Sequence, residues 1–296
     1  MPSVSHCVVT PEEAGQKLFQ YLSRRLGKDV PKSLLMRLVR TGQVRVDGRR
    51  AKPFDRLRVG QTVRIPPVRL DEPEKPNDET QACDERLFLP ILYQSNGVLA
   101  INKPAGLPVQ PGTGWTDCVA ARLAVMFPEA PFQPTPAHRL DRDTSGVLLA
   151  GTSYEGLRRL QEMFRFGGIG KDYLAVAKGR VDAPAHLVDA LGKAGPVGRE
   201  RVVVGAGKRA EAELMPLRPG KNFSLVLVRL LTGRTHQIRV QLASRGHPLL
   251  GDMKYGGGGG PLHLHAWRIT LPEVTVSVLP DWEGDMAVSE DDLTPF

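Results

Sequence analysis

The chain has 296 residues, of which 41% are hydrophobic, so it is long enough for two domains or for one large domain with a small appendage. No stretch approaches the roughly 20 apolar residues of a membrane span, and the N-terminus lacks a basic region followed by an apolar core. We therefore expect a soluble, cytoplasmic protein. Three widely spaced cysteines without a Cys-x-x-Cys pair indicate neither a disulfide framework nor a zinc site.

The net charge of +8 is divided unevenly along the chain. Residues 1–70 contain 15 Lys and Arg against 5 acidic residues, and residues 86–280 contain 24 against 14. Between them, residues 71–85 hold 7 acidic residues and one Lys, and the segment from residue 281 onward holds 6 acidic residues and no basic one. Two basic bodies joined by an acidic linker favour a polyanionic partner such as nucleic acid over a merely solvated surface.

The first predicted element is a helix that begins at Thr10–Glu13. Thr is a good N-cap, Pro suits the first helical position, and Glu three residues after the Thr completes a capping box. Leu18, Leu22 and Leu26 then recur at helical spacing, and Gly27 ends the element.

A second helix is predicted over residues 32–41, with leucines on one arc and basic side chains on the other. Lys32, Arg37 and Arg40 occupy the basic arc. One face of this helix can therefore be buried while the other meets phosphate.

A basic β-hairpin follows the second helix. Residues 44–50 alternate around Asp-Gly, which is typical of a tight turn, and strands are predicted to continue over residues 57–65. Short helices followed by a small basic sheet resemble the α-L RNA-binding module, the type found in ribosomal protein S-four. We expect this small α+β domain to span residues 1–69 and to bind RNA through Lys32, Arg37, Arg40 and Arg45.

Residues 70–86 are acidic, contain prolines and have almost no large apolar side chain, so they predict a linker. Strands and helices mix in the large domain that follows, residues 87–280, and composition alone indicates an α+β class. The predicted strands are 98–101, 146–150, 173–177 and 223–231, and the predicted helices are 118–127, 154–164 and 235–245. Residues 281–296 are predicted to be an acidic tail.

Two features suggest cofactors but do not support them. His263 and His265 project to one face of a predicted strand, but without a third ligand a structural role explains them better than a metal does. The glycines at 256–260 lack the Lys-Ser/Thr that completes a phosphate-binding loop, so a flexible surface loop is the better interpretation. We therefore expect no metal and no nucleotide cofactor.

The run His138–Gly146, followed by an apolar stretch, is the most informative feature of the chain. It places Asp141 between Arg139 and Arg142, just before a turn and a buried strand. Because neighbouring positive charge favours the charged form of a carboxylate, this Asp is a candidate nucleophile or base. On charge pattern alone, a surface ion-pair cluster that caps a turn is the commoner explanation.

Four motifs in a fixed order decide between these interpretations. Residues 102–106 (Asn-Lys-Pro-Ala-Gly) precede the run, and residues 171–176 (Lys-Asp-Tyr-Leu-Ala-Val) and 233–239 (Gly-Arg-Thr-His-Gln-Ile-Arg) follow it. In this order they resemble the catalytic domain of the RluA family, the pseudouridine synthases that modify large-subunit ribosomal RNA, over about residues 89–272. Residues 30–69 look like the module of its RluC branch. The resemblance implies one large mixed, mostly antiparallel sheet with the active cleft across it.

The resemblance also implies three catalytic positions. Asp141 matches the catalytic Asp, which either attacks the ribose C1′ or removes a sugar proton to give a glycal. Tyr173 matches the active-site Tyr that stacks on uracil and helps to move its C5 proton. Arg239 matches the basic residue that pairs with the Asp and would hold it ionised and oriented, so we expect Asp141 and Arg239 to meet within hydrogen-bonding distance.

Further positions are expected to serve RNA binding. Arg139 is placed to enter the space left by a uridine that flips out of the RNA, a step that costs on the order of a few kcal/mol. Arg234 and His236 are expected to support the cleft or contact phosphate. Lys103 is expected to make a phosphate or loop-positioning contact.

Together these features predict a cofactor-free enzyme that isomerises uridines in 23S large-subunit ribosomal RNA, with a monomer favoured. Two alternatives stay open: a transfer-RNA pseudouridine synthase that uses the same site, and a non-catalytic RNA-binding or ribosome-assembly factor. Asp141, Tyr173 and Arg239 count against the second, because binding alone does not demand this trio.

Overall fold

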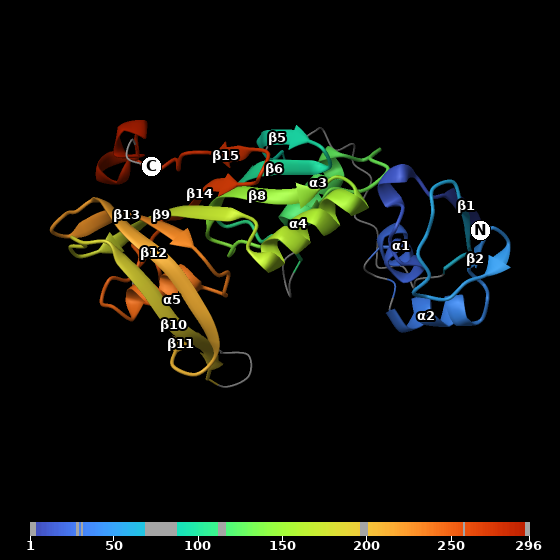
Figure 1. Ribbon diagram of the computed structural model, residues 1–296, viewed down its shortest axis with the longest axis horizontal. Helices are drawn as coiled ribbons and strands as arrows, with labels where there is room; N and C mark the ends of the chain where they lie inside the picture. The colour runs from blue at the N-terminus through green and yellow to red at the C-terminus, as the bar shows by residue number, and fades with distance from the viewer. Residues whose placement is uncertain are drawn as a thin grey trace.

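The chain folds around two separate sheets (Figure 1). The computed structural model describes residues 4–27, 30, 32–68, 88–111, 117–195, 201–256 and 258–293. The predicted linker at residues 70–86, the glycine at residue 257 and the side chain of Lys32 lie outside the described part. No helix within the described residues has the length and apolarity that crossing a bilayer requires.

The N-terminal module is a four-stranded antiparallel sheet covered by two helices. Its strand order is β1-β4-β2-β3. The elements are β1 (Ser5–Val8), α1 (Leu18–Arg25), α2 (Lys32–Arg40), β2 (Arg45–Val46), β3 (Arg49–Arg50) and β4 (Thr62–Ile65). The helices bury their leucine-rich arcs against the sheet, as the spacing predicts. Strand β1 has no counterpart among the predicted elements.

The predicted first helix is wrong at its start. The capping box of Thr10 and Glu13 is present, but it caps only a 3-10 turn, Pro11–Glu13. Gly15 then adopts a φ of +84°, a left-handed conformation that a helix does not contain, and α1 begins at Leu18. A capping pattern marks where a turn starts but does not guarantee that the helix propagates beyond it.

The hairpin prediction is confirmed, and the strands predicted after it are only partly right. Asp47 and Gly48 have φ values of +50° and +75°, the positive angles that a type I′ turn requires at both central residues. Of residues 57–65, only Thr62–Ile65 form a named strand. Leu57 is buried in the module core from an irregular segment.

The large sheet has eleven strands in the order β11-β10-β12-β13-β9-β14-β8-β6-β5, with β15 beside β14 and β7 beside β8. All of its described pairs are antiparallel except β14 with β8, which confirms the expected mixed, mostly antiparallel α+β class. The strands are β5 (Ile91–Ser95), β6 (Val98–Lys103), β7 (Thr135–Pro136), β8 (Ser145–Gly151), β9 (Gly170–Lys178), β10 (Ala185–Ala194), β11 (Arg201–Val204), β12 (Lys208–Arg218), β13 (Phe223–Leu230), β14 (Leu264–Thr270) and β15 (Thr275–Ser277).

Helices cover both faces of this sheet. They are α3 (Val119–Met126), α4 (Tyr154–Phe166) and α5 (Gln237–Ala243). Leu123 of α3 and Leu242 of α5 pack in the two clusters that Tyr173 joins, so these helices cover the face of β9 on which Tyr173 lies. Leu174, the next residue, faces the opposite side, where it packs with Leu293 of the C-terminal segment.

The predicted acidic tail packs against the domain. Its described part contains two 3-10 turns, η3 (Gly284–Met286) and η4 (Glu290–Leu293). Arg218 donates a hydrogen bond to the carbonyl of Ala287 at 2.8 Å and forms an ion pair with Asp292 at 3.5 Å. Residues 281–293 therefore form part of the wall behind β9 and β14.

His265 has the structural role expected of it. Its Nε2 lies 2.8 Å from the carbonyl of Val278, which can only accept, so this nitrogen carries the proton and Nδ1 accepts from the hydroxyl of Ser145 at 2.8 Å. Burial lowers the pKa of His265 to about 4, which keeps the ring neutral. The ring thus joins the start of β8 to the residue that follows β15. Among the described residues, no cluster of three or more His, Cys, Asp or Glu could hold a metal.

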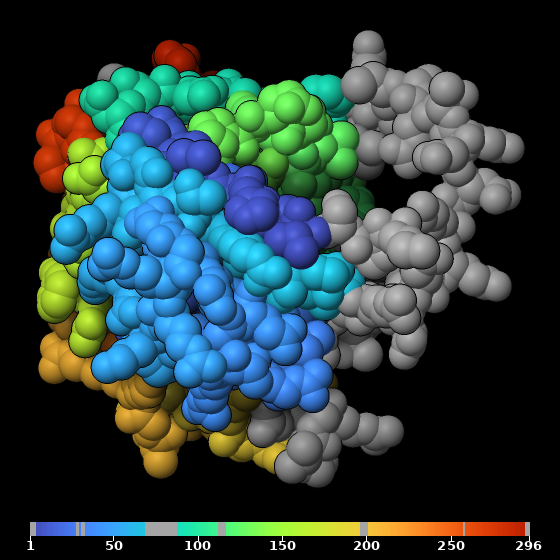
Figure 2. All heavy atoms as spheres, turned by 90° about the vertical axis from the view of Figure 1, so that its right-hand side faces the viewer, coloured from blue at the N-terminus to red at the C-terminus, as the bar shows by residue number. Residues whose placement is uncertain are grey.

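The module lies at one end of the molecule, next to the large domain (Figure 1), and it faces the viewer in Figure 2. The guanidinium of Arg24 lies 4.4 Å from the ring centroid of Phe132 and donates to the hydroxyl of Thr135 at 3.1 Å. Gln20 and Tyr154 form a longer contact at 3.5 Å. Partial burial at this contact lowers the pKa of Arg24.

Gly146, the last residue of the run that contains Asp141, allows the close parallel pairing of β8 with β14. Its φ is +105°, and a Cβ here would overlap the backbone of Ala266. We predict that Gly146→Ala lowers the free energy of unfolding by at least about 3 kcal/mol, measured by chemical denaturation. In Gly106→Ala the φ is also positive, at +82°, but the space is open, so about 1 kcal/mol is expected. Equal losses in the two variants would contradict this account.

Candidate active site

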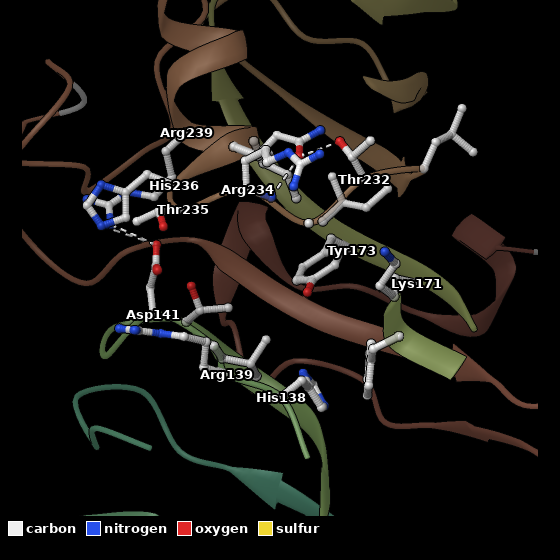
Figure 3. Close-up of a pocket in the computed structure, with 18 of the residues that line it drawn as sticks. His138, Arg139, Asp141, Lys171, Tyr173, Thr232, Arg234, Thr235, His236 and Arg239 are labelled. Carbon is white, nitrogen blue, oxygen red and sulfur yellow. Dashed lines mark hydrogen bonds and ion pairs between the residues drawn. The ribbon is translucent and has the colours of Figure 1, made fainter. Parts of the chain in front are cut away.

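A pocket of about 560 Å³ opens on the Tyr173 face of the sheet (Figure 3). Its walls come from residues 138–141 and Thr144, from the end of α4 and the start of β9, from residues 230–239, and from Leu264 of β14. The pocket brings together six of the predicted site residues: Arg139, Asp141, Tyr173, Arg234, His236 and Arg239.

Asp141 meets Arg239, as predicted. The Oδ2 atom of Asp141 accepts a hydrogen bond from Nη1 of Arg239 at 3.1 Å. Its Oδ1 atom makes no hydrogen bond with any residue that the structure describes, and the side chain stays 22% exposed. One carboxylate oxygen is therefore fixed by the protein while the other is open to the pocket.

Arg239 is held in place by a second carboxylate, that of Asp252. Nε and Nη2 of Arg239 donate to the two oxygens of Asp252, both at 2.8 Å, and this carboxylate is completely buried. The fork geometry leaves Nη1 directed at Asp141. Burial by itself lowers the pKa of Arg239, but the hydrogen bonds and charge of Asp252, joined by Asp141, raise it above its ordinary value.

His236 lines the same side of the pocket. It caps α5 with a left-handed backbone, φ +53°, which is uncommon for a residue with a side chain. Its Nδ1 lies 2.8 Å from the hydroxyl of Tyr255 and its Nε2 lies 3.7 Å from Asp141. Burial lowers the pKa of His236, Asp141 opposes this effect, and Arg239 adds to it. We therefore expect a neutral ring that supports Asp141 sterically.

Tyr173 projects from β9 into the centre of the pocket (Figure 3). Burial raises the pKa of its phenol, and the charge of Asp141 raises it further. The hydroxyl therefore stays protonated at neutral pH. A flat, half-buried ring with a neutral hydroxyl is suited to stacking on a base.

The predicted role of Arg139 and Arg142 beside Asp141 needs correction. Arg142 forms an ion pair with Asp143 at 2.8 Å. Arg139 is exposed at the pocket and makes no hydrogen bond or ion pair with any described residue. The guanidinium that pairs with Asp141 thus belongs to Arg239, which is distant in the chain, and not to the arginines that neighbour Asp141 in sequence.

Lys103 has the loop-positioning role that was one of its two expected roles, whereas the prediction that it binds RNA needs a correction. Its side chain is fully buried, and its ammonium donates to the carbonyls of Pro104, Leu107 and Arg142, each at 2.8 Å. Burial lowers the pKa of Lys103 to about 7, against the charges of Asp143 and Asp141. With its three donors used and no exposed surface, Lys103 positions the loop that carries Asp141 and does not reach phosphate.

The remaining predicted RNA contacts lie outside the pocket. Arg37 and Arg40 are exposed on α2. Arg45 is exposed on β2, with long hydrogen bonds of 3.4 Å to the carbonyls of Gly42 and Gly48. All three side chains therefore lie on the N-terminal module and do not line the pocket.

Three residues of the site were not predicted from the sequence: Lys171, which lines the pocket, and Asp252 and Tyr255, which contact the lining residues Arg239 and His236. Asp252 and Tyr255 follow a strand-like segment and precede the run of glycines, which drew the interpretation toward a flexible loop. A buried Asp–Arg pair has no local sequence signature because its partners are distant in the chain. Lys171 stands in a recognised motif, where Tyr173 was the only residue given a role.

Comparison with known proteins agrees with this geometry. Residues 97–244, which include Asp141, Tyr173 and Arg239, match the family described as RNA pseudouridylate synthase, and the chain belongs to this family. It is thus an enzyme of the class that the four motifs predict.

Two curated relatives carry the same name. The chain is 40% identical over 262 residues to ribosomal large subunit pseudouridine synthase C of Escherichia coli K12, with 86% of this chain and 81% of the relative covered. The protein of that name from Haemophilus influenzae is 38% identical over 284 residues, with 90% and 87% covered. Among solved structures, human RNA pseudouridylate synthase domain containing 1 is 27% identical with a TM-score of 0.57, covering 66% of this chain and 84% of that one.

The Asp252 contact generates a prediction. Asp252→Asn removes the charge that fixes Arg239, so we expect the single-turnover rate on RNA to fall about 10²-fold and stability to fall by roughly 3 kcal/mol. Asp172→Asn is the matched control, because Asp172 is also a buried carboxylate between two arginines but lies on the opposite face of β9. That variant should lose stability and keep its rate; a similar rate in both variants would refute the positioning role of Asp252.

Proposed function

We propose that this protein converts uridine to pseudouridine in the 23S RNA of the large ribosomal subunit. The observation that carries the chemistry is the Asp141 carboxylate, fixed at one oxygen by Arg239 and open to the pocket at the other. The substrate is supported by the name shared by the Escherichia coli and Haemophilus influenzae relatives. In a bacterium, a cytoplasmic location follows from that substrate.

The proposed reaction is an isomerisation within one nucleotide. The bond from ribose C1′ to N1 breaks, the detached uracil turns, a bond from C1′ to C5 forms, and the C5 proton leaves while N1 gains one. Electrons and atoms balance, so the reaction requires neither a redox cofactor nor an energy source. It requires a carboxylate at the sugar, a pocket that retains the base, and an acceptor for the C5 proton.

Asp141 Oδ1 is the reacting atom in this proposal. It attacks C1′ to form a covalent intermediate, or it removes a sugar proton to give a glycal. In both routes Arg239 keeps its hydrogen bond to Oδ2, so the carboxylate rotates little as the reaction proceeds.

Tyr173 and Arg139 handle the base and the gap that it leaves. The ring of Tyr173 stacks on the uracil, and its protonated hydroxyl is available to assist transfer of the C5 proton. Arg139, exposed at the pocket, fills the space that the flipped uridine vacates in the RNA. Arg37, Arg40 and Arg45 of the module add affinity through phosphates without reading sequence.

The central experiment compares Asp141→Asn with Asp143→Asn on ribosomal RNA. Asp143 lies in the same loop but pairs with Arg142 and does not line the pocket. We predict that Asp141→Asn lowers pseudouridine formation by roughly 10³-fold or more while RNA binding is retained, and that Asp143→Asn stays within a few-fold of the unaltered protein.

Mapping pseudouridines in cells with and without the gene identifies the substrate. Loss of specific sites from 23S RNA is the expected result. If sites are lost from transfer RNA instead, transfer RNA is the substrate. An Asp141→Asn protein with full activity would overturn the mechanism.

The module generates a second prediction. Replacing Arg37 and Arg40 together by Gln should weaken RNA binding and reduce the slope of log K against log salt by roughly 1.5, because two phosphate contacts are lost. The single-turnover rate at saturating RNA should stay unchanged, since neither residue reaches the pocket. Unchanged affinity and slope would mean that this face of the module does not contact RNA.

A further inference from the structure

The pocket contains cations that the proposed chemistry does not use. Among its described lining residues Asp141 is the only carboxylate. The same lining holds Arg139, Arg165, Lys171, Arg234 and Arg239. In Figure 3 Tyr173 lies between Asp141 and Lys171, so Lys171 stands at the end of the pocket away from the carboxylate.

Lys171 is half-buried in this end and makes no hydrogen bond or ion pair with any described residue. The acid next to it in sequence cannot neutralise it. Strand alternation directs Asp172 to the opposite face, where it accepts from Arg229 at 2.9 Å and from Arg268 at 2.7 Å. Lys171 shares the face of Tyr173.

Arg234 is anchored but keeps donors to spare. Its Nε donates to the carbonyl of Arg209 at 2.9 Å, and its backbone N–H donates to the side chain of Gln237 at 3.0 Å. Its two Nη nitrogens make no hydrogen bond with the described residues. The guanidinium is thus fixed at one edge and open at the other, the arrangement that suits recognition of phosphate oxygens.

The two cations act on each other. Burial lowers the pKa of Lys171, and the charge of Arg234 lowers it further. Two positive charges in one partly buried pocket repel, and an anion seated between them removes this cost. The anion that every RNA nucleotide brings to such a pocket is its backbone phosphate.

We propose that Lys171 and Arg234 together bind one backbone phosphate next to the flipped uridine. The target is then held at two ends, with its sugar at Asp141 and a phosphate beyond Tyr173. The guanidinium of Arg234 provides directional hydrogen bonds and the ammonium of Lys171 provides charge. Because the anion is part of the RNA, this phosphate site rests on the function proposed above.

The test is a double-mutant cycle that combines removal of one positive charge from the protein with removal of one negative charge from the RNA. A short RNA that contains a target uridine is prepared with the phosphates around it replaced one at a time by neutral methylphosphonates. Dissociation constants are measured for the unaltered protein, Lys171→Met and Lys178→Met. Lys178 lies at the other end of β9, outside the pocket. Lys178→Met therefore removes one positive charge, as Lys171→Met does, but leaves the pocket lining unchanged.

One methylphosphonate position should weaken binding by the unaltered protein and by Lys178→Met about tenfold, and should leave Lys171→Met unaffected. Arg234→Gln should lose sensitivity at the same position, and Lys171→Arg should recover it. Arg234→Gln also provides the measurement if Lys171→Met is unstable, since its side chain is exposed.

The phosphate site is overturned if every methylphosphonate affects Lys171→Met as much as the unaltered protein. It is also overturned if Lys178→Met loses the same sensitivity. Pseudouridine formation on the unmodified RNA is measured separately. Absence of product with the methylphosphonate pattern intact would sink the proposed reaction and leave the phosphate site standing, because the cycle measures binding alone.

Discussion

One guanidinium shared by two carboxylates sets the geometry of the pocket. Asp252 is completely buried and accepts hydrogen bonds from two of the three guanidinium nitrogens of Arg239, Nε and Nη2. This fixes the direction of the third nitrogen, Nη1, which donates to Asp141 and so sets the position of its carboxylate. A buried ion pair contributes little net stability, because desolvating the charges costs about as much as their attraction returns. The ion pair instead orients the site: the carboxylate of Asp141, which we propose to be catalytic, lies on a loop but is held by a side chain of helix α5.

This arrangement explains how charge is divided across the pocket. Asp141, paired with Arg239, is the only carboxylate among the described residues that line the pocket, whereas Lys171 and Arg234 line it without a carboxylate partner among those residues. A nucleotide is polar in the matching sense, since its sugar carbon becomes electron-poor in the reaction while its phosphate is an anion. Under the proposed function, a phosphate is therefore favoured near Lys171 and Arg234, and the electron-poor sugar carbon is favoured near Asp141.

Much of the site could be predicted from the sequence because four motifs preserve their order, and the Asp141–Arg239 contact follows from matching positions alone. Other features needed three dimensions. Lys103 is indistinguishable in sequence from a phosphate-binding lysine, and only its three carbonyl partners reveal a buried support. The Thr10 capping box is real, but the residue that ends its turn, Gly15, lies beyond the pattern. Asp252 acts only through Arg239, which it meets in the folded state.

Packing on the face of β9 opposite the pocket helps to fix which of its side chains line the pocket. Its residues alternate, so Lys171 and Tyr173 face the pocket while Asp172 and Leu174 face the C-terminal segment. A shift of one residue would place an acid and a leucine in the pocket. That shift would break the ion pairs of Asp172 with Arg229 and Arg268. It would also remove Leu174 from its apolar cluster. The C-terminal segment, through Leu293, therefore helps to determine that Tyr173 faces the pocket.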